Sequence, residues 1–327
     1  MKREIVRPAS APVAAEPEAA ARSRADATKE LTKGRQHRSL WGDAVRRFLQ
    51  HRLATAGASI FVVLVVLTAI GPMLYNVSTQ DIDFAASMKA PSATHLFGTD
   101  DLGHDILARV LWGGRISIAV GLAAMLVSIT LGTLVGSVAG FFGRTVDIVL
   151  MRITDVFISI PQLPLLLLII YLFRDNLTKR LGTSTGIFLL LVAVIGGLNW
   201  MATARLVRAG FLSVKEKEYI LAARSIGVRN TRQMVVHILP NVLSPVLVAA
   251  TLAVGSAIIA ESTLSFLGLG FPPDVPTWGR LLFDAQNYLN LAPWMAIFPG
   301  LMIFLAVLSI NYVGDGLRDA LDPHRTL

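Results

Sequence analysis

Residues 218–227 read EYILAARSIG and residues 237–241 read HILPN, and both stretches lie in a polar, basic island between two long apolar segments. On a helix, Glu218 and Ala222 share one face because they lie four residues apart. The small side chains of Ala222 and Ala223 predict a shallow surface that another protein can approach closely. We therefore expect a helix with a docking face at the start of the island.

The sequence also predicts where this helix ends and where the next ones begin. Gly227 ends it, because glycine tolerates the left-handed conformation that is common just past a helix C-terminus. A second short helix is expected from Arg229. Pro240 fits the first turn of the next long helix, where its missing N–H costs little. The result is a helix–turn–helix knob between two apolar segments.

The composition is typical of a protein that crosses a membrane several times. Of 327 residues, 54% are hydrophobic, and the mean hydropathy is +0.60, far above that of a soluble domain. The chain has no cysteine, which excludes disulfides and thiolate metal sites, and its six histidines lack the spacing of metal ligands. We expect this chain to bind no metal and no cofactor.

We predict an all-α fold with six transmembrane helices, of which the first has the ~20 residues needed to cross a bilayer. Residues 1–38 predict a disordered basic tail, solvated and attracted to anionic lipid. Residues 39–52 have apolar side chains on one helical face and arginines on the other, which predicts an elbow helix in the membrane interface. The membrane domain, 53–323, has spans at about 53–75, 115–142, 153–173, 186–207, 241–267 and 292–313.

The distribution of positive charge predicts the orientation. The segments on one side of the membrane hold 23 Lys and Arg residues, and the three loops on the other side hold six. The positive-inside rule places the richer side in the cytoplasm. Both termini and the loop 208–240 are therefore predicted to be cytoplasmic. The net charge of +8 is then explained by orientation, without nucleic-acid binding.

Small residues line one face of the second span. Gly132, Gly136 and Gly140 lie four residues apart, and such a face lets another helix approach to backbone contact. In the link that follows, Arg152 is expected to form local ion pairs with Asp147 and Asp155 on a helix surface. The third span contains Pro161 and Pro164, which should kink it or break its start.

Glu261 is a carboxylate inside the fifth span, where a charge is costly and normally faces protein or water. Two interpretations stay open: Glu261 lines a pathway or gate, or it has a structural role near the far end of the span. In the loop that follows, 268–292, the Gly/Pro-rich sequence predicts irregular structure. Trp278 and Trp294 are expected in the aromatic belt at the interface.

No motif in the sequence favours catalysis by this chain. It has no Gly-x4-Gly-Lys-[Ser/Thr] phosphate-binding loop, no His-Glu-x2-His and no Gly-x-Ser-x-Gly. If ATP drives its process, another subunit must hydrolyse it.

The order Glu-x3-Ala-Ala-x3-Gly from Glu218, followed by Leu239-Pro240, resembles the EAA loop of ABC importer permeases. Further stretches resemble one branch of that family, the second membrane subunit of dipeptide, oligopeptide and nickel importers. Together they cover the chain from about 40 to 323, and one departure is His104, where the family usually has Arg or another long polar residue. These stretches are HLFGTD at 95–100 with Gly103 and Asp105, GGRIS at 113–117, Asp147 with Met151, Arg152 and Asp155, ES at 261–262 with SFLGLG at 265–270, and GDGLRD at 314–319.

The resemblance implies the type I importer fold and a permease that works by alternating access in the bacterial inner membrane. The implied partners are a homologous second permease, two ATPase subunits that bind ATP and Mg²⁺, and an extracytoplasmic substrate-binding protein. The loop would be the coupling helix that docks on an ATPase. Its implied contact residues are Glu218, Ala222, Ala223, Arg224, Gly227, Leu239 and Pro240.

The substrate stays open: di- or oligopeptides lead, with nickel complexes, glutathione and sugars behind. A different class of function is a secondary transporter or channel that works alone, which predicts midplane ionisable residues and an internal repeat. A membrane-anchored nucleic-acid binder is disfavoured, because the basic tail lacks aromatic residues for stacking.

Overall fold

The computed structural model describes residues 40–321, so the predicted basic tail and residues 322–327 lie outside the described residues. The chain divides into two units, Met1–Arg46 and Arg47–Leu327. Helix α2 (Leu40–Gln50) covers most of the stretch expected to form the elbow helix and crosses from the first unit into the second. Its location in the membrane interface stays a prediction.

Between residues 40 and 321 the regular structure is helical, as predicted, apart from one isolated β-bridge between Thr99 and Asp105. The elements of the second unit are α3 (Arg52–Leu74), η1 (Phe84–Ala86), α4 (Ile106–Phe142), α5 (Arg144–Ser159), α6 (Gln162–Leu181), α7 (Thr183–Gly197), α8 (Trp200–Lys215), α9 (Glu218–Ser225), α10 (Asn230–Arg232), η2 (Gln233–Ile238), α11 (Leu239–Phe266), α12 (Trp278–Ala285) and α13 (Trp294–Leu321).

The number of possible membrane spans agrees with the prediction of six. Among the described residues, four helical stretches are long and apolar enough to cross a membrane: α3, α4, the run Asn230–Phe266 and α13. Two helix pairs pass the same test together, α5 with α6, bent by 87°, and α7 with α8, bent by 42°. Counting each bent pair as one span gives six.

The third span differs from its predicted range, 153–173. It consists of α5 and α6, and it breaks before Pro161, because proline disfavours the helical conformation of the preceding residue. Ile160 accordingly has an extended ψ of 130°. Most of the expected polar loop 174–185 is helical, since α6 continues to Leu181 and the chain turns only at Gly182, where φ is +83°.

The fourth span, predicted at 186–207, is also broken. α7 ends at Gly197 and α8 begins at Trp200. The side-chain amide of Asn199 donates to the carbonyl oxygen of Ile195 at 2.7 Å, and side chains that bond the local backbone in this way compete with the helical pattern. Neither proline nor a positive φ is needed for this break.

Two other long helices extend beyond their predicted ranges. α4 begins at Ile106 rather than near 115, because the Asp105 carboxylate caps it by accepting from the N–H of Ala108 at 2.9 Å. α13 continues to Leu321 without the expected break after 313. Gly316 does not end this helix; a Cβ there would collide with the side chain of Ala54 in α3, so glycine allows close packing.

Three clusters of buried apolar side chains hold the second unit together. One joins α4, α6, α7 and α11, a second joins α3, α4, α11, α12 and α13, and a third joins α8, α9 and the start of α11. Trp278 lies in the second cluster, 0% exposed, and donates from Nε1 to the carbonyl oxygen of Val110 at 3.0 Å. Its expected position in an aromatic belt is therefore wrong, and it begins the unpredicted helix α12.

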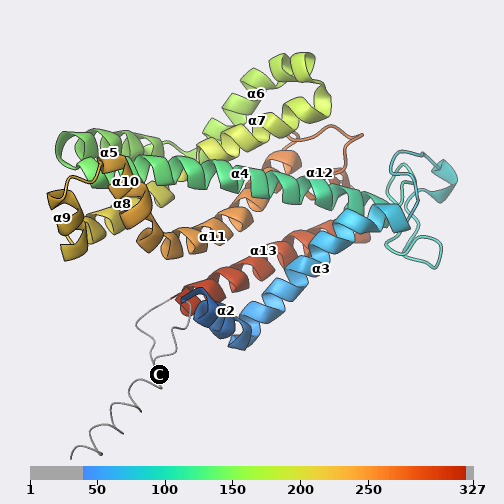
Figure 1. The fold of residues 1–327 in the computed structure, drawn as a ribbon. Coiled ribbons are helices and arrows are strands. Elements are labelled where there is room, and N and C mark those ends of the chain that lie inside the picture. The colour runs from blue at the N-terminus through green and yellow to red at the C-terminus, as the bar shows by residue number, and fades with distance from the viewer. Residues whose placement is uncertain (1–39, 322–327) are drawn as a thin grey trace, which may run out of the picture. The chain divides into compact units, whose positions relative to one another are not determined.

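Helix α4 spans the long dimension of the second unit (Figure 1). α8, α9 and α10 lie around one of its ends, and the segment between α3 and α4 lies at the other. The polar island that the sequence singled out is therefore far from the other polar segment, residues 76–105.

Candidate functional site

Helix α9, at the centre of the polar island, is anchored to the two longer helices that flank it. Ile220 is 3% exposed and packs in the cluster that contains Phe211 of α8, Ile238 of η2 and Val242 of α11. Burial of an aliphatic side chain of this size stabilises a structure by about 1.5–3 kcal/mol. Although α9 has only eight residues, a force on it is therefore transmitted to α8 and α11.

The turn after α9 has the two hydrogen bonds of a Schellman motif. The N–H of Gly227 donates to the carbonyl oxygen of Arg224 at 3.0 Å, and the N–H of Val228 donates to that of Ala223 at 3.1 Å. Gly227 has a φ of +80°, and a Cβ there would meet open space. The backbone conformation, rather than crowding, therefore favours glycine at this position.

A buried amide fixes the second half of the knob. Gln233 is 3% exposed and donates from Nε2 to the carbonyl oxygen of Val228 at 2.6 Å. The following turn is π-helical, with the N–H of Leu239 donating to the carbonyl oxygen of Met234. Pro240 then lies in the first turn of α11. Neither Gln233 nor the π turn can be predicted from the sequence, because a single polar residue in this stretch carries no periodic signal.

The outward face of α9 contains two of the seven predicted contact residues. Glu218 and Ala222 are exposed on this face, Pro240 is exposed in α11, and Leu239 is half-buried. Arg224 is exposed too, but its side chain lines the cavity beside the end of α4 instead of the outward face. Ala223 is buried, so the expectation that it shares the open surface is not met. Its small size instead lets α9 lie close to the rest of the chain.

Apolar side chains that the sequence analysis did not select extend this face. Tyr219 is 49% exposed, Leu221 46% and Ile226 82%. Large apolar side chains grouped on one short polar helix are typical of a surface that another protein or a membrane covers. The sequence does not separate them from buried residues, because apolar side chains lie on more than one face of this eight-residue helix.

The glycine face of α4 packs on α8, the helix that leads into α9. A Cβ at Gly132 would lie 2.6 Å from the Cβ of Thr203, and one at Gly140 would lie 2.6 Å from that of Phe211. Between them, a Cβ at Gly136 would overlap the carbonyl oxygen of Ala204. The two backbones therefore approach closely along the whole seam, and α8 is held against the longest helix.

The acidic side chains of α5 pair with arginines of α8. The Asp147 carboxylate accepts from Arg208 Nη2 at 2.6 Å, and Asp155 lies 2.6 Å from Arg205. The predicted local pairs with Arg152 are therefore wrong. Asp147 and Arg152 are five residues apart and lie on different faces of α5, whereas the arginines of the neighbouring helix reach both carboxylates.

Glu261 is fully buried, with 0% exposure. Its Oε2 accepts from the hydroxyl of Ser117 at 2.9 Å, and its Oε1 accepts from that of Ser265 at 2.7 Å. The Ser117 oxygen also accepts from the N–H of Trp278 at 3.3 Å. This carboxyl group connects α4, α11 and the start of α12, which favours the structural interpretation over a pathway or gate.

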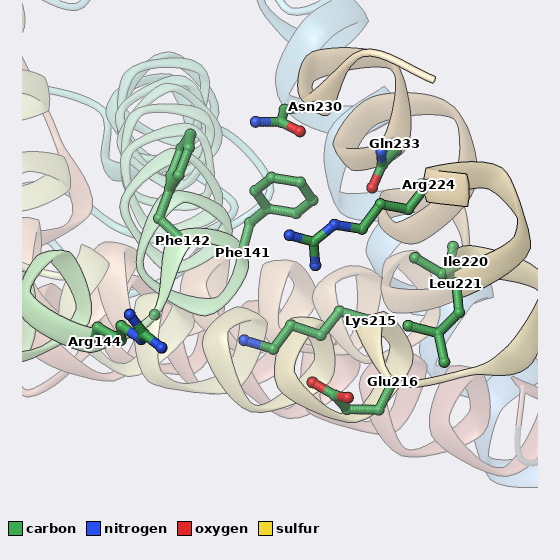
Figure 2. Close-up of a pocket in the computed structure, with 11 residues that line it drawn as sticks. Phe141, Phe142, Arg144, Lys215, Glu216, Ile220, Leu221, Arg224, Asn230 and Gln233 are labelled. Carbon is green, nitrogen blue, oxygen red and sulfur yellow. The ribbon is translucent and has the colours of Figure 1, made fainter. Parts of the chain in front are cut away.

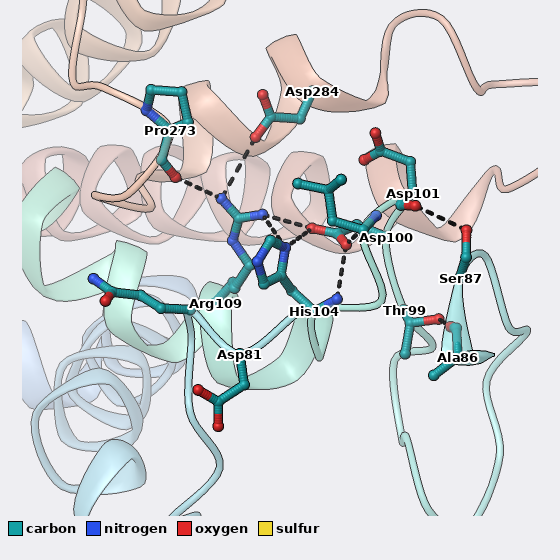
Figure 3. A network of polar contacts seen from close by, with 12 residues as sticks. Asp81, Ala86, Ser87, Thr99, Asp100, Asp101, His104, Arg109, Pro273 and Asp284 are labelled. Atoms are coloured by element: carbon teal, nitrogen blue, oxygen red, sulfur yellow. Dashed lines mark hydrogen bonds and ion pairs between the residues drawn. The ribbon is translucent and has the colours of Figure 1, made fainter. Parts of the chain in front are cut away.

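The opposite end of the unit has a buried polar network (Figure 3). Asp100 accepts from Arg109 Nη1 at 2.6 Å and lies 2.8 Å from His104 Nδ1. Arg109 Nη2 donates to the carbonyl oxygen of Pro273 at 3.0 Å and lies 3.5 Å from Asp284. His104, which departs from the family pattern, thus keeps a close contact. Within residues 40–321, no group of three or more His, Asp and Glu side chains could hold a metal ion.

The same end contains a tyrosine whose ionisation should report on folding. The Tyr75 hydroxyl donates to Asp105 Oδ2 at 3.0 Å, and burial together with this carboxylate raises the pKa of Tyr75 to about 12. The folded state therefore favours the protonated phenol. This stabilisation is fully present below the ordinary pKa of about 10 and is lost as the pH rises towards 12.

We expect Tyr75→Phe to lower the free energy of unfolding by about 1 kcal/mol at pH 8, because one hydrogen bond to a carboxylate is lost. The difference from wild type should shrink between pH 10 and 12. Thermal unfolding of the detergent-solubilised chain at pH 8 and at pH 12 tests this. Tyr171→Phe is the control, since Tyr171 is 73% exposed. A difference that does not change with pH would contradict the assignment.

Comparison with known proteins places these features in context. Residues 132–326 match the family described as "Binding-protein-dependent transport system inner membrane component", and residues 39–91 match the "N-terminal TM domain of oligopeptide transport permease C". The oligopeptide transport system permease protein OppC of Escherichia coli K12 is 42% identical over 288 residues, which are 88% of this chain and 92% of that protein. The dipeptide transport system permease protein DppC of Alkalihalophilus pseudofirmus is 38% identical over 285 residues, 87% of this chain and 90% of that protein.

A solved structure has a similar fold. It is an inward-facing conformation of the MetNI methionine ABC transporter, with a TM-score of 0.50 and 18% sequence identity. The match covers 64% of this chain and 94% of that chain. At this identity the likeness concerns the fold alone.

Proposed function

Since this chain belongs to the inner membrane components of binding-protein-dependent transport systems, we propose that it is the permease subunit of an ATP-binding-cassette importer of peptides. The observation that carries the proposal is α9, a short helix with an exposed face and a buried attachment to α8 and α11. Di- or oligopeptides are the proposed substrates, because relatives that match most of the chain carry those names.

The proposed assembly contains four kinds of protein in or at the bacterial inner membrane. A homologous permease pairs with this chain, two ATPase subunits bind ATP and Mg²⁺ below, and a substrate-binding protein docks on the outer side. Both termini and α9 face the cytoplasm in this arrangement, as the distribution of Lys and Arg predicts. This chain contributes the pathway and the mechanical connection, and its partners hydrolyse ATP.

The proposed mechanism follows from how α9 is attached. An ATPase subunit that binds Glu218 and Ala222 moves α9 when the two ATPase subunits close on ATP. The buried side chain of Ile220 and the Gly227 turn prevent α9 from moving alone, so α8 and α11 move with it. The seam between α8 and α4 passes this motion into the membrane spans, which then open towards the binding protein. Hydrolysis resets them.

A bulky side chain on the outward face should separate the subunits without unfolding the spans. Ala222 is exposed, so we expect Ala222→Trp to leave the thermal unfolding midpoint of the isolated chain near that of wild type. ATPase copurification and peptide uptake should each fall at least tenfold, because one misplaced large side chain at an interface core prevents close packing. Ala222→Ser is the matched control and should behave as wild type.

Gly227→Asp tests the turn instead of the face. A non-glycine residue in the left-handed conformation costs about 1–2 kcal/mol, so the end of α9 should shift and uptake should fall.

Tagged wild type and both variants are co-expressed with candidate ATPase and permease subunits and recovered from solubilised membranes. Normal peptide uptake by both Ala222→Trp and Gly227→Asp would contradict the proposed role of α9 in coupling to the ATPase. If folded wild type recovers no ATPase with any partner set, a transporter acting alone would replace the proposal.

A further inference from the structure

A cavity of about 600 Å³ lies beside α9, where α4 ends (Figure 2). Its walls come from the last turn of α4, the first residue of α5, the end of α8, α9, and the first residues of α10 and η2. Arg144, Lys215 and Arg224 line it, each from a different helix, and Glu216 is the one acidic residue among the lining residues. The lining therefore has an excess of two positive charges.

None of these three cations forms an ion pair with a carboxylate among the described residues, although the Asp147 carboxylate, which binds Arg208, also attracts Lys215. Within residues 40–321, the ion pairs involve other side chains. Lys215 Nζ instead donates to the carbonyl oxygen of Gly140 at 3.0 Å, which fixes the ammonium group at the end of α4. Figure 2 shows the side chains of Lys215 and Arg224 pointing into the space between α4 and α9. Like charges that converge in this way repel each other unless an anion joins them.

The position of the cavity indicates where that anion comes from. Phe141 and Phe142 are the last residues of α4, a stretch apolar enough to cross a membrane, and both line the cavity. Phe142 is 52% exposed, and aromatic side chains at the end of a span lie at the level of the lipid headgroups. The end of α4 therefore has the composition expected near the headgroups, on the side that the Lys and Arg distribution predicts to be cytoplasmic.

We propose that this cavity binds the phosphate of an anionic phospholipid headgroup, with Arg144, Lys215 and Arg224 around the phosphate and Phe142 beside the start of the acyl chains. Basic pockets between spans on the cytoplasmic side are suited to such headgroups. A bound headgroup would join α9 to the end of α4 and the start of α5. This lipid site does not require that the chain transport peptides, so it can be tested separately.

The test uses the full chain, purified in detergent and depleted of lipid, and titrated with short-chain phosphatidylglycerol, phosphatidylcholine or inorganic phosphate. Native mass spectrometry measures the occupancy. We expect saturable binding of phosphatidylglycerol and at least tenfold weaker binding of phosphatidylcholine and free phosphate. In the variant Arg144→Gln/Lys215→Gln/Arg224→Gln, the affinity for phosphatidylglycerol should fall on the order of a hundredfold, since each cation contributes about fivefold.

A matched control removes the same charge from the same surface without touching the cavity. Lys217→Gln/Arg229→Gln/Arg232→Gln should bind phosphatidylglycerol within about threefold of wild type, because general attraction to the surface is weaker than a built site. Equal losses in the two triple variants would overturn the proposal in favour of diffuse attraction. Equal binding of phosphatidylcholine would overturn it too, as would free phosphate binding as tightly as the lipid.

A second variant guards against a folding defect in the triple variant. Arg144→Gln/Lys215→Gln leaves α9 untouched and should weaken phosphatidylglycerol binding on the order of 25-fold by the same reckoning. Unchanged lipid binding in both cavity variants, with ATPase copurification lost, would assign the cavity to an acidic group of the ATPase and overturn the lipid assignment.

Discussion

Gly136→Leu is expected to prevent the chain from accumulating as a folded membrane protein. A Cβ at Gly136 would overlap the carbonyl oxygen of Ala204 and lie 2.8 Å from the Cβ of Val207. The first of these is backbone, so no change of rotamer can relieve the clash. Overpacking a well-packed interior typically costs about 1–3 kcal/mol when side chains can adjust, and we expect more than about 3 kcal/mol here.

The size of this effect comes from the environment as well as from the clash. Helices in a bilayer associate through close packing of small residues, since lipid is as apolar as the side chains. Moving α8 away from α4 would open the seam from Gly132 to Gly140 and displace the base of α9. Uptake should therefore be lost together with stability.

The measurement is the fraction of detergent-solubilised chain that elutes as a single species, together with its thermal unfolding midpoint. Gly136→Ala should show an intermediate loss, and Gly197→Ala is the matched control, because a Cβ at Gly197 meets no atom within 4 Å. A monodisperse Gly136→Leu protein with the wild-type midpoint would show that the seam is not close-packed.

Glu261→Ala is expected to lower the free energy of unfolding by about 3–5 kcal/mol. The substitution leaves a cavity in a site that is 0% exposed, and truncation of a large buried side chain costs about 2–5 kcal/mol. It also removes the acceptor for the hydroxyls of Ser117 and Ser265, and a buried polar group without a partner costs about 1–3 kcal/mol. The cost of the cavity and the cost of the unpaired hydroxyls overlap, so their sum is an upper limit for the loss in the free energy of unfolding.

Glu261→Gln separates the two interpretations of this carboxylate. Glutamine keeps the volume and one acceptor oxygen, so a structural role predicts a loss of only about 1 kcal/mol and nearly normal uptake. A pathway or gate role predicts the reverse: unchanged stability with altered uptake. Glu216→Ala is the control for removing a carboxylate, since Glu216 is exposed. Unchanged unfolding of Glu261→Ala would contradict the structural role.

Local features of the sequence were sufficient to predict much of the fold. The first span, predicted from about Leu53 to Tyr75, is α3 from Arg52 to Leu74, because an apolar run of that length has few alternatives in a bilayer. Gly227 and Pro240 were placed correctly at the end and start of helices, since capping and proline chemistry involve only a few neighbouring residues.

The errors have a common origin in contacts between distant parts of the chain. Asp147 and Asp155 were paired with the nearby Arg152, but they bond Arg208 and Arg205, about fifty or more residues along the chain. Trp278 was assigned to the membrane surface, because an aromatic residue in a Gly/Pro-rich loop resembles a belt residue until a cluster from four other helices surrounds it. The break at Asn199 needed a side-chain bond that hydropathy does not report.

The sequence by itself determined that this chain is an all-helical, multi-span membrane protein with a short helix–turn–helix knob, because hydrophobic length, charge asymmetry and turn chemistry are local properties. The permease assignment came from the resemblance of its motifs to a known family. Only the tertiary structure decided that Ala223 faces inward while Ala222 faces outward, that the glycines of α4 contact α8, and that Glu261 is enclosed by hydroxyls. It also brought Arg144, Lys215 and Arg224 to one cavity. Each of these depends on the rotation of one helix against another, and packing between helices sets that rotation once the spans have formed.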